Sequence, residues 1–379
     1  MEIKAAGIRR TTLLALLATF AVGCSDGDLS GTDSPGSTLV FNGEGNRLNA
    51  YDVDRDDAKQ TVIERRSEDP DGWDINAQIC FDPHTPDGVT RFIAGEDTNQ
   101  PELPAGWGYF ELFGREVGEL SASRIGKLTP TYQPAASSPE NYGCGFLSNG
   151  TLVTTDVGNQ SSGDGTGQLI LWFPPFDSFR VAYCKLDVEI GTAGGIYVDE
   201  DDQIYVASAR VQPGIWRYEP PFPTSDDASG GCGRIDVTGA PLADSVTREL
   251  FIGSSAETPT TSGVAPNGRG GFYVTSVING VIAEFDADGT FVRRVLEPPP
   301  GENLGPVPYS TGTPFGIGVD STGNIYYADI GLVLRENGGI GPGSRLGTVR
   351  RIRFEDGVPQ APDLMDSGLS FPDGIGVLD

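Results

Sequence analysis

Few residues in this chain could do chemistry, and the shortage of histidine sets the first limit. Among its 379 residues there is one histidine, His84. It stands in the turn-forming run DPHTPDG, where an exposed loop residue is the ordinary outcome. A single histidine excludes a His-rich zinc site, a histidine dyad and haem held by paired histidines. A Ser-His-Asp triad would have to use His84, and no G-x-S-x-G elbow accompanies it.

What remains is carboxylate and amide chemistry, carried by residues that stand just before a recurring glycine. Asp373, Asn76 and Asn141 hold such positions. If the strands that carry them converge on one axis, a carboxylate and two amides face each other, and these are hard oxygen ligands of the kind that Ca²⁺ takes. The alternative is that they cap strands and accept bonds from backbone amides, as Asp and Asn commonly do.

The elements that must position these residues belong to an internal repeat. Residues 313–329, TPFGIGVDSTGNIYYAD, predict a glycine-containing strand, a turn and a second strand. The glycines suit a strand pressed against its neighbours, where a missing side chain permits close backbone approach. Ungapped copies occupy residues 143–156, 195–208 and 263–276, with a weaker copy at 78–95.

A sixth copy is split between the two ends of the chain. Residues 371–379 supply a first strand, and residues 36–42 supply the matching second strand. A repeat begun at one end and finished at the other predicts a closed ring, an all-β six-bladed β-propeller with four-stranded antiparallel blades. The first strands are expected to begin near Asn76, Asn141, Thr192, Thr261, Thr313 and Phe371. Further strands are expected in residues 167–174, 214–220, 280–286 and 347–354.

Two stretches resemble a known repeat. Residues 42–52, NGEGNRLNAYD, are similar to the second half of an NHL repeat, and residues 316–329 are similar to its first half. The run PDGIGV around Asp373 resembles the strand starts that supply calcium ligands in the gluconolactonase (SMP-30) and diisopropyl-fluorophosphatase group. The resemblance implies a calcium-dependent hydrolase of lactones or esters, with Asp373 as the best-matched calcium ligand. Asn76 and Asn141 are weaker matches, because they stand one position further before the repeat glycine than Asp373 does when the repeats are aligned.

The chain also departs from that group. The corresponding columns hold small or apolar residues where a fuller ligand set would supply carboxylates: Ala193, Gly194, Thr261, Ser262, Pro314 and Phe315. A second polar column at the ends of second strands, Asn42, Asp156 and Asp329, is interpreted as turn-bonding and is assigned no chemistry.

The N-terminus predicts export. Residues 1–23 have a basic start and an apolar run too short for a permanent membrane span, which is typical of a signal peptide. The run AVGC resembles a lipoprotein cleavage box, with Cys24 as the acylated residue; an ordinary cleaved signal peptide is the alternative. Ser25 after it implies, by analogy, an outer-membrane lipoprotein. Residues 24–37 predict a flexible tether and 38–379 the propeller.

The other four cysteines predict two disulfides, because an exported chain folds in an oxidising compartment and the number of remaining cysteines is even. Four cysteines allow three connectivities. We expect Cys80–Cys144, on inner strands of adjacent blades, and Cys184–Cys232, on outer parts of adjacent blades.

The net charge of the chain narrows the range of possible binding partners. A formal charge of −27 argues against nucleic acid, since phosphate binding needs concentrated Lys and Arg. We expect a monomer that meets the membrane only through its lipid. Two functions stay open: a surface binding module that takes an unknown ligand through its loops, or the calcium-dependent hydrolase, which would act on a small-molecule substrate.

Overall fold

The computed structural model describes residues 37–65, 75–96, 106–131, 141–157, 167–178, 180–298, 312–334 and 339–379. All of them belong to one unit of the chain, Gly36–Asp379. They contain β-strands, one 3-10 helix, η1 (Ala228–Gly230), and no α-helix. The predicted signal peptide, the lipidation site Cys24 and almost all of the tether lie outside the described residues. None of the described residues forms a helix of the length and apolarity needed to cross a membrane.

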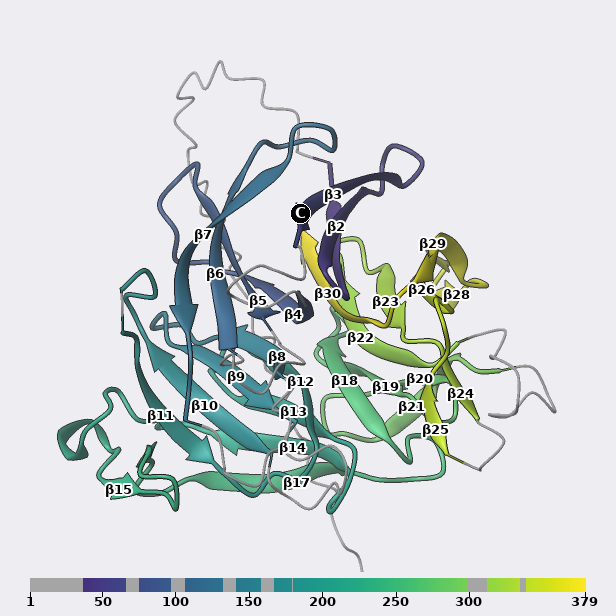
Figure 1. The fold of residues 1–379 in the computed structure, drawn as a ribbon. Coiled ribbons are helices and arrows are strands. Elements are labelled where there is room, and N and C mark those ends of the chain that lie inside the picture. The colour runs from purple at the N-terminus through teal and green to yellow at the C-terminus, as the bar shows by residue number, and fades with distance from the viewer. Residues whose placement is uncertain are drawn as a thin grey trace, which may run out of the picture. The chain divides into compact units, whose positions relative to one another are not determined.

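The strands form six blades, as the repeat predicted (Figure 1). Blade 1 is β4 (Asn76–Phe81), β5 (Thr90–Glu96), β6 (Gly106–Phe113) and β7 (Ser121–Leu128). Blade 2 is β8 (Asn141–Phe146), β9 (Leu152–Asp156), β10 (Gln168–Phe173) and β11 (Ala182–Asp187). Blade 3 is β12 (Ala193–Val198), β13 (Ile204–Ser208), β14 (Gly214–Glu219) and β17 (Thr247–Gly253).

The remaining three blades follow the same antiparallel order. Blade 4 is β18 (Thr261–Pro266), β19 (Phe272–Ser276), β20 (Val281–Phe285) and β21 (Phe291–Leu296). Blade 5 is β22 (Pro314–Val319), β23 (Ile325–Asp329), β26 (Gly347–Ile352) and β29 (Asp363–Leu369). Blade 6 is β30 (Pro372–Leu378), β1 (Leu39–Glu44), β2 (Arg47–Asp52) and β3 (Ala58–Glu64). Two short hairpins interrupt blade 5: β24 (Leu332–Leu334) with β25 (Ile340–Pro342), and β27 (Phe354–Glu355) with β28 (Val358–Pro359).

Blade 6 closes the ring with strands from both ends of the chain. The last strand, β30, pairs antiparallel with β1, from Leu39 opposite Leu378 to Gly43 opposite Gly374. The six inner strands then contact one another in a complete cycle: β4, β8, β12, β18, β22, β30 and back to β4. The split repeat therefore predicted the closure correctly.

The repeat glycines permit the inner strands to approach backbone to backbone. A Cβ on Gly374 would lie 1.6 Å from the carbonyl oxygen of Ala77 in the next blade, and one on Gly316 would lie 2.2 Å from that of Asp373. No side chain fits at such distances, which is why this column favours glycine.

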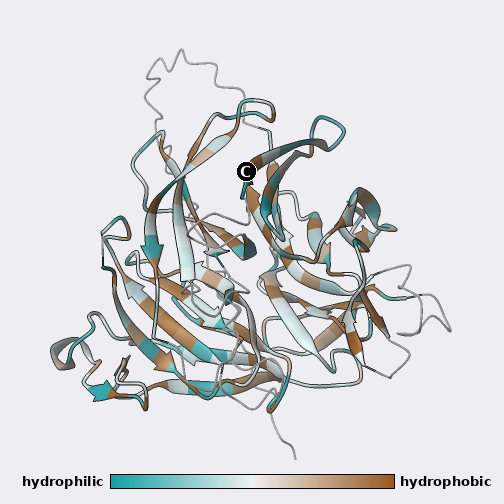
Figure 2. Ribbon diagram, viewed as in Figure 1, coloured by the Kyte–Doolittle hydropathy of each residue, from teal (hydrophilic) through white to brown (hydrophobic). Residues whose placement is uncertain are grey.

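Each interface between neighbouring blades has its own apolar cluster, six among the described residues. Between blades 6 and 1, for example, Phe41 and Phe92 are both fully buried. Figure 2 shows hydrophobic residues on the strands of the blades, interspersed with hydrophilic ones. Burial of a large apolar side chain contributes about 1.5–3 kcal/mol. Because the buried side chains are divided among these six interfaces, the contacts between blades stabilise the ring in place of a single central core.

An insertion in blade 3 was not predicted. After β14 the chain forms η1, β15 (Arg234–Ile235) and β16 (Pro241–Leu242), and β16 joins the outer edge of blade 2 parallel to β11. Blade 2 therefore has six strands and not the four expected. Two bonds fix the insertion: the predicted disulfide Cys184–Cys232, and an ion pair of 2.7 Å between Lys185 Nζ and Asp236 Oδ2.

Several turns between strands are stabilised in the same way, by an aspartate carboxylate that accepts hydrogen bonds from backbone N–H groups of the turn. In Asp199, Asp286 and Asp320 one carboxylate oxygen, Oδ1, accepts hydrogen bonds from the backbone N–H groups two and four residues later, at 2.8–3.0 Å. The predicted turn role of residues 320–323 is therefore confirmed.

Replacing Asp320 with asparagine is expected to flatten the loss of stability in acid. Burial raises the pKa of Asp320, but hydrogen bonds from Thr322, Asn324 and Tyr326 outweigh it and hold this pKa below its ordinary value. A depressed carboxyl pKa gives stability that is present above the unfolded value, about 3.9, and is lost as the pH falls through the folded value. Urea titrations below pH 5 would check this, with Asp201→Asn, an exposed carboxylate in the matching turn of blade 3, as the control. Equal acid sensitivity in both variants would contradict it.

Candidate functional site

The central channel is the site at which the predicted ligands would have to meet. The inner strands all begin at one face of the ring and end at the other, so Asn76, Asn141 and Asp373 stand at the same face. Asp373 lines the channel together with Gln78 and Tyr142. The space left there is about 10 Å³, which is enough for one water molecule.

Two aromatic rings fill the channel from opposite blades. Tyr142 of blade 2 packs edge to face on Phe315 of blade 5, with ring centroids 4.4 Å apart. The Tyr142 hydroxyl donates a hydrogen bond of 3.2 Å to the backbone carbonyl of Asp373 in blade 6. Trp107 is buried in β6 within the interface of blades 1 and 2. Tyr142 and Phe315 therefore meet across the channel from opposite blades.

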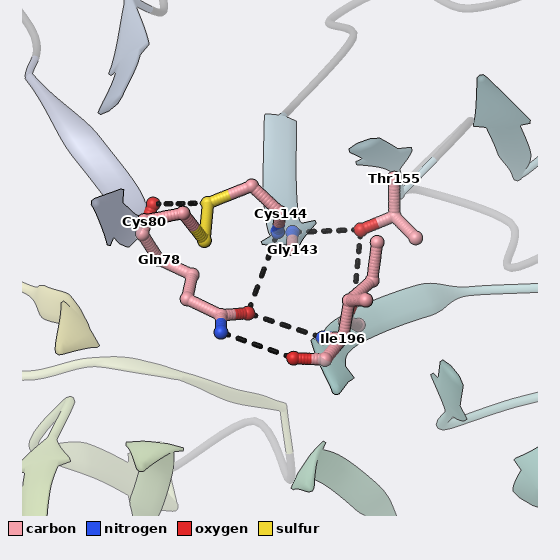
Figure 3. The surroundings of a disulfide bond; sticks show 7 residues. Gln78, Cys80, Gly143, Cys144, Thr155 and Ile196 are labelled. Carbon is pink, nitrogen blue, oxygen red and sulfur yellow. Dashed lines mark hydrogen bonds between the residues drawn. A yellow bond between two sulfur atoms is a disulfide. The ribbon is translucent and has the colours of Figure 1, made fainter. Parts of the chain in front are cut away.

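A glutamine adds a polar bridge where the other blades have glycine. Gln78 stands in the repeat column that holds Gly143, Gly195, Gly263, Gly316 and Gly374. Its side-chain oxygen accepts from the backbone N–H groups of Cys144 (3.4 Å) and Ile196 (3.1 Å), and its nitrogen donates to the carbonyl of Ile196 at 3.0 Å (Figure 3). One amide thus ties the inner strands of blades 1, 2 and 3. The sequence analysis missed Gln78, although its place in a column of glycines was a usable signal.

The disulfide beside Gln78 joins the same inner strands. Cys80 and Cys144 are bonded as predicted, with Cα atoms 6.0 Å apart (Figure 3). Next to them the Thr155 hydroxyl accepts from Gly143 N–H and donates to the carbonyl of Gly194, both at 2.7 Å. Blades 1 to 3 are therefore crosslinked around the channel by covalent and polar bonds.

The structure brings one of the three predicted metal ligands to the channel. The Asp373 carboxylate is 4% exposed, and its Oδ1 accepts from the Ala77 N–H at 3.1 Å. Asn141 turns toward blade 1, where its amide nitrogen donates to the carbonyl of Gly106 at the start of β6. The Asn76 side-chain oxygen lies over Gly95 of its own blade, 2.8 Å from where a Cβ on that glycine would stand.

Ca²⁺ takes six to eight oxygen ligands, more than these three side chains supply by themselves. Each makes or faces a contact with nearby backbone, which is the strand-capping alternative raised above. Within the described ranges no group of three or more His, Cys, Asp or Glu residues could hold a metal ion. The assignment of calcium to Asp373, Asn76 and Asn141 stays a prediction.

The second polar column takes part in local bonding. The Asp329 carboxylate accepts from Thr313, Gly331 and Thr348, and the Asn42 amide nitrogen donates to the carbonyl of Gly374. Asp156 accepts from Gln168 at 3.3 Å. Asp329 agrees with the turn-bonding interpretation through its bond from Gly331, whereas Asn42 and Asp156 bond to neighbouring strands, β30 and β10.

A buried charge cluster beside that column was also missed. At the end of β5, the fully buried Glu96 pairs with Arg65, with Arg124 at 3.2 Å and with Lys127 at 3.8 Å. A carboxylate without access to water needs such partners to stay ionised. The sequence gives no signal for this cluster, because Arg65 follows β3 in blade 6, whereas Arg124 and Lys127 come from β7 in blade 1.

Comparisons with known proteins bear on the fold. No protein-family model and no curated protein matches the chain. Among solved structures, it is similar to a luciferin-regenerating enzyme, with 13% identity over 83% of this chain and 92% of that one and a TM-score of 0.50. At this identity the likeness shows the fold alone, the six-bladed β-propeller.

Two further solved structures are similar at lower TM-scores. One is regucalcin, a calcium-binding protein from Agrobacterium tumefaciens, with 15% identity over 75% of each chain and a TM-score of 0.44. The other is a gluconolactonase from Xanthomonas campestris, with 13% identity over 77% of this chain and 83% of that one and a TM-score of 0.43.

Proposed function

We propose that this protein is an exported, lipid-anchored binding module, which acts as a monomer and takes its ligand at surface loops of the propeller and not in the channel. The observation that carries the proposal is the filled channel. Among the described residues, Tyr142, Phe315 and Gln78 reach into the channel, and the pocket that Gln78, Tyr142 and Asp373 line has a volume of about 10 Å³. A site for a small molecule typically has roughly 300–1,000 Å³.

Export is supported by the cysteines. Disulfides persist in oxidising compartments and are rare in the cytosol. The chain has two, Cys80–Cys144 and Cys184–Cys232, with Cα separations of 6.0 and 6.1 Å. Together with the signal-like residues 1–23 they favour a location at the cell envelope, held there by a lipid on Cys24.

A calcium-dependent hydrolase of lactones or esters is the second candidate. What favours it is Asp373, a buried carboxylate on the channel wall at the face where the inner strands begin. A bound cation would supply polarisation of a carbonyl oxygen. The ring of Tyr142 would first have to leave Phe315, because the channel pocket lined by described residues has a volume of only about 10 Å³.

Calcium titration separates the two candidates. For the binding module we expect no tight calcium site that depends on Asp373, and therefore the same melting temperature in calcium and in chelator. A cation at a hundredfold excess over its Kd would instead add about 2.7 kcal/mol of stability. The measurement is calorimetry and thermal melting of the wild type and of Asp373→Ala, with Asp201→Ala on the opposite face as the control. Tight binding lost only in Asp373→Ala, with calcium-dependent cleavage of a lactone panel, would overturn the binding module.

A further inference from the structure

A groove between blades 1 and 2 opens at the face where the inner strands end, away from Asp373. Its volume is about 290 Å³, near the lower limit of small-molecule sites. Blade 1 contributes the β4–β5 turn with His84, and blade 2 contributes the β8–β9 turn with Asn149 and the β10–β11 turn from Pro174 to Asp177. A space of this size fits one ring-sized ligand.

The floor of the groove is fixed by hydrogen bonds. The Tyr109 hydroxyl donates to Asp82 Oδ2 at 2.6 Å, and Asp82 Oδ1 accepts from the His84 N–H at 2.9 Å. Burial, followed by the neighbouring Asp82 carboxylate, raises the pKa of Tyr109, which keeps the phenol protonated. The Tyr109 ring packs edge to face on Phe176, with centroids 5.4 Å apart. These side chains are therefore pre-organised, and little conformational entropy would be lost on binding.

The rim presents both donors and acceptors. His84 Nε2 lies 3.0 Å from the carbonyl of Leu147, which can only accept, so this nitrogen carries hydrogen and donates to it. The Asn149 oxygen accepts from the Thr151 N–H at 2.9 Å, so its amide nitrogen is the group available to donate. Asp177 adds an exposed carboxylate, and the exposed rings of Pro174 and Pro175 add an apolar wall.

The charges of the groove disfavour an anion and leave one exposed carboxylate, Asp177, facing it. The one guanidinium, Arg91, pairs with Glu111 through Nε and Nη2, both at 3.0 Å from the same oxygen. An anion would meet Asp82 and Asp177 in a chain of net charge −27. Glu111, in contrast, offsets the charge of Arg91, and Asp82 is already bonded to Tyr109 and to the His84 backbone N–H. Vicinal hydroxyls, each of which donates and accepts, match this mixed set, and the C–H face of a sugar ring matches proline and aromatic walls.

We propose that this groove binds a neutral, polyhydroxylated ligand of one ring, a monosaccharide or the terminal residue of a glycan. The proposal rests on the binding-module function and names its ligand class. It also gives the single histidine a role in recognition and none in catalysis.

The test is a titration of the full chain, purified in mild detergent, with four neutral sugars: glucose, galactose, mannose and xylose. Glucosamine and glucuronate are the matched cationic and anionic probes. The variant is Asp177→Asn, and the control is Asp288→Asn, an exposed aspartate in the same third-to-fourth-strand turn of blade 4. Binding is read by calorimetry and by ligand-observed NMR.

We expect saturable binding of at least one neutral sugar, weaker binding of both charged probes, and an apparent Kd that rises about tenfold in Asp177→Asn and not in the control. If a neutral sugar binds equally well to Asp177→Asn and Asp288→Asn, the groove is not its binding site, but the binding-module proposal is unaffected. Better binding of glucosamine or glucuronate, or no sugar bound at all, would overturn the ligand class. The calcium titration decides the binding module separately, so the two failures can be told apart.

Discussion

Replacing Asp236 with alanine is expected to lower the free energy of unfolding by about 3–5 kcal/mol, because it leaves a buried ammonium without its counter-ion. The Lys185 side chain is 0% exposed and that of Asp236 2%, and their charged atoms are 2.7 Å apart. Burial lowers the pKa of Lys185, which shows how poorly this position solvates a charge. Asp236 also accepts from the N–H groups of Thr238 and Ala240, so the same change loosens the turn that seats the insertion on blade 2.

Chemical denaturation of wild type and Asp236→Ala measures the effect. The control is Glu64→Ala, which breaks the exposed pair Arg47–Glu64 and is expected to cost only about 0–1 kcal/mol. A second variant, Lys185→Met with Asp236→Leu, removes both charges and is expected to regain most of the loss, since an apolar pair of similar volume is often neutral or stabilising. A loss below about 1 kcal/mol in Asp236→Ala would show that water reaches the lysine.

Removing the Cys80–Cys144 disulfide by a double change to alanine is expected to cost about 2–5 kcal/mol. The bond joins residues 64 positions apart in the sequence, and a loop of that length lies in the range where the chain-entropy estimate is about 4 kcal/mol. In the folded ring the crosslink holds β4 against β8 beside the Gln78 bridge, so its loss also frees the channel wall (Figure 3).

Urea unfolding of the oxidised wild type, the reduced wild type and Cys80→Ala/Cys144→Ala separates the two contributions. The reduced wild type keeps the sulfur atoms and loses only the crosslink, whereas the variant also loses the packing of the buried Cys144. In a Cys184→Ala/Cys232→Ala background, where only the Cys80–Cys144 bond can be reduced, we expect stability to decrease in that order. Equal midpoints for oxidised and reduced protein would contradict a stabilising crosslink, provided that Cys184→Ala/Cys232→Ala is used as the background so that only one bond is reduced.

Much of the fold follows from local pattern. The six first strands, their turns and the closure by residues 371–379 and 36–42 could be predicted because a strand–turn–strand repeat is written in consecutive residues. The disulfide pairing followed from the same blade assignment. The blade 3 insertion could not be predicted, because β15 and β16 are only two residues each and one of them pairs with a different blade.

The candidate site, unlike the fold, could be predicted only in part from local sequence. The sequence by itself determined which residues stand at the mouth of the channel: Asp373, Asn76 and Asn141 precede the repeat glycines, and their register with those glycines is fixed by the chain. Only the tertiary structure decided where their side chains go. Asn141 turns to the carbonyl of Gly106 in the next blade, and the axis is filled by Tyr142, Phe315 and Gln78 from three blades. Those contacts depend on which backbone groups lie within hydrogen-bond distance after the ring has closed, and no stretch of sequence contains that information.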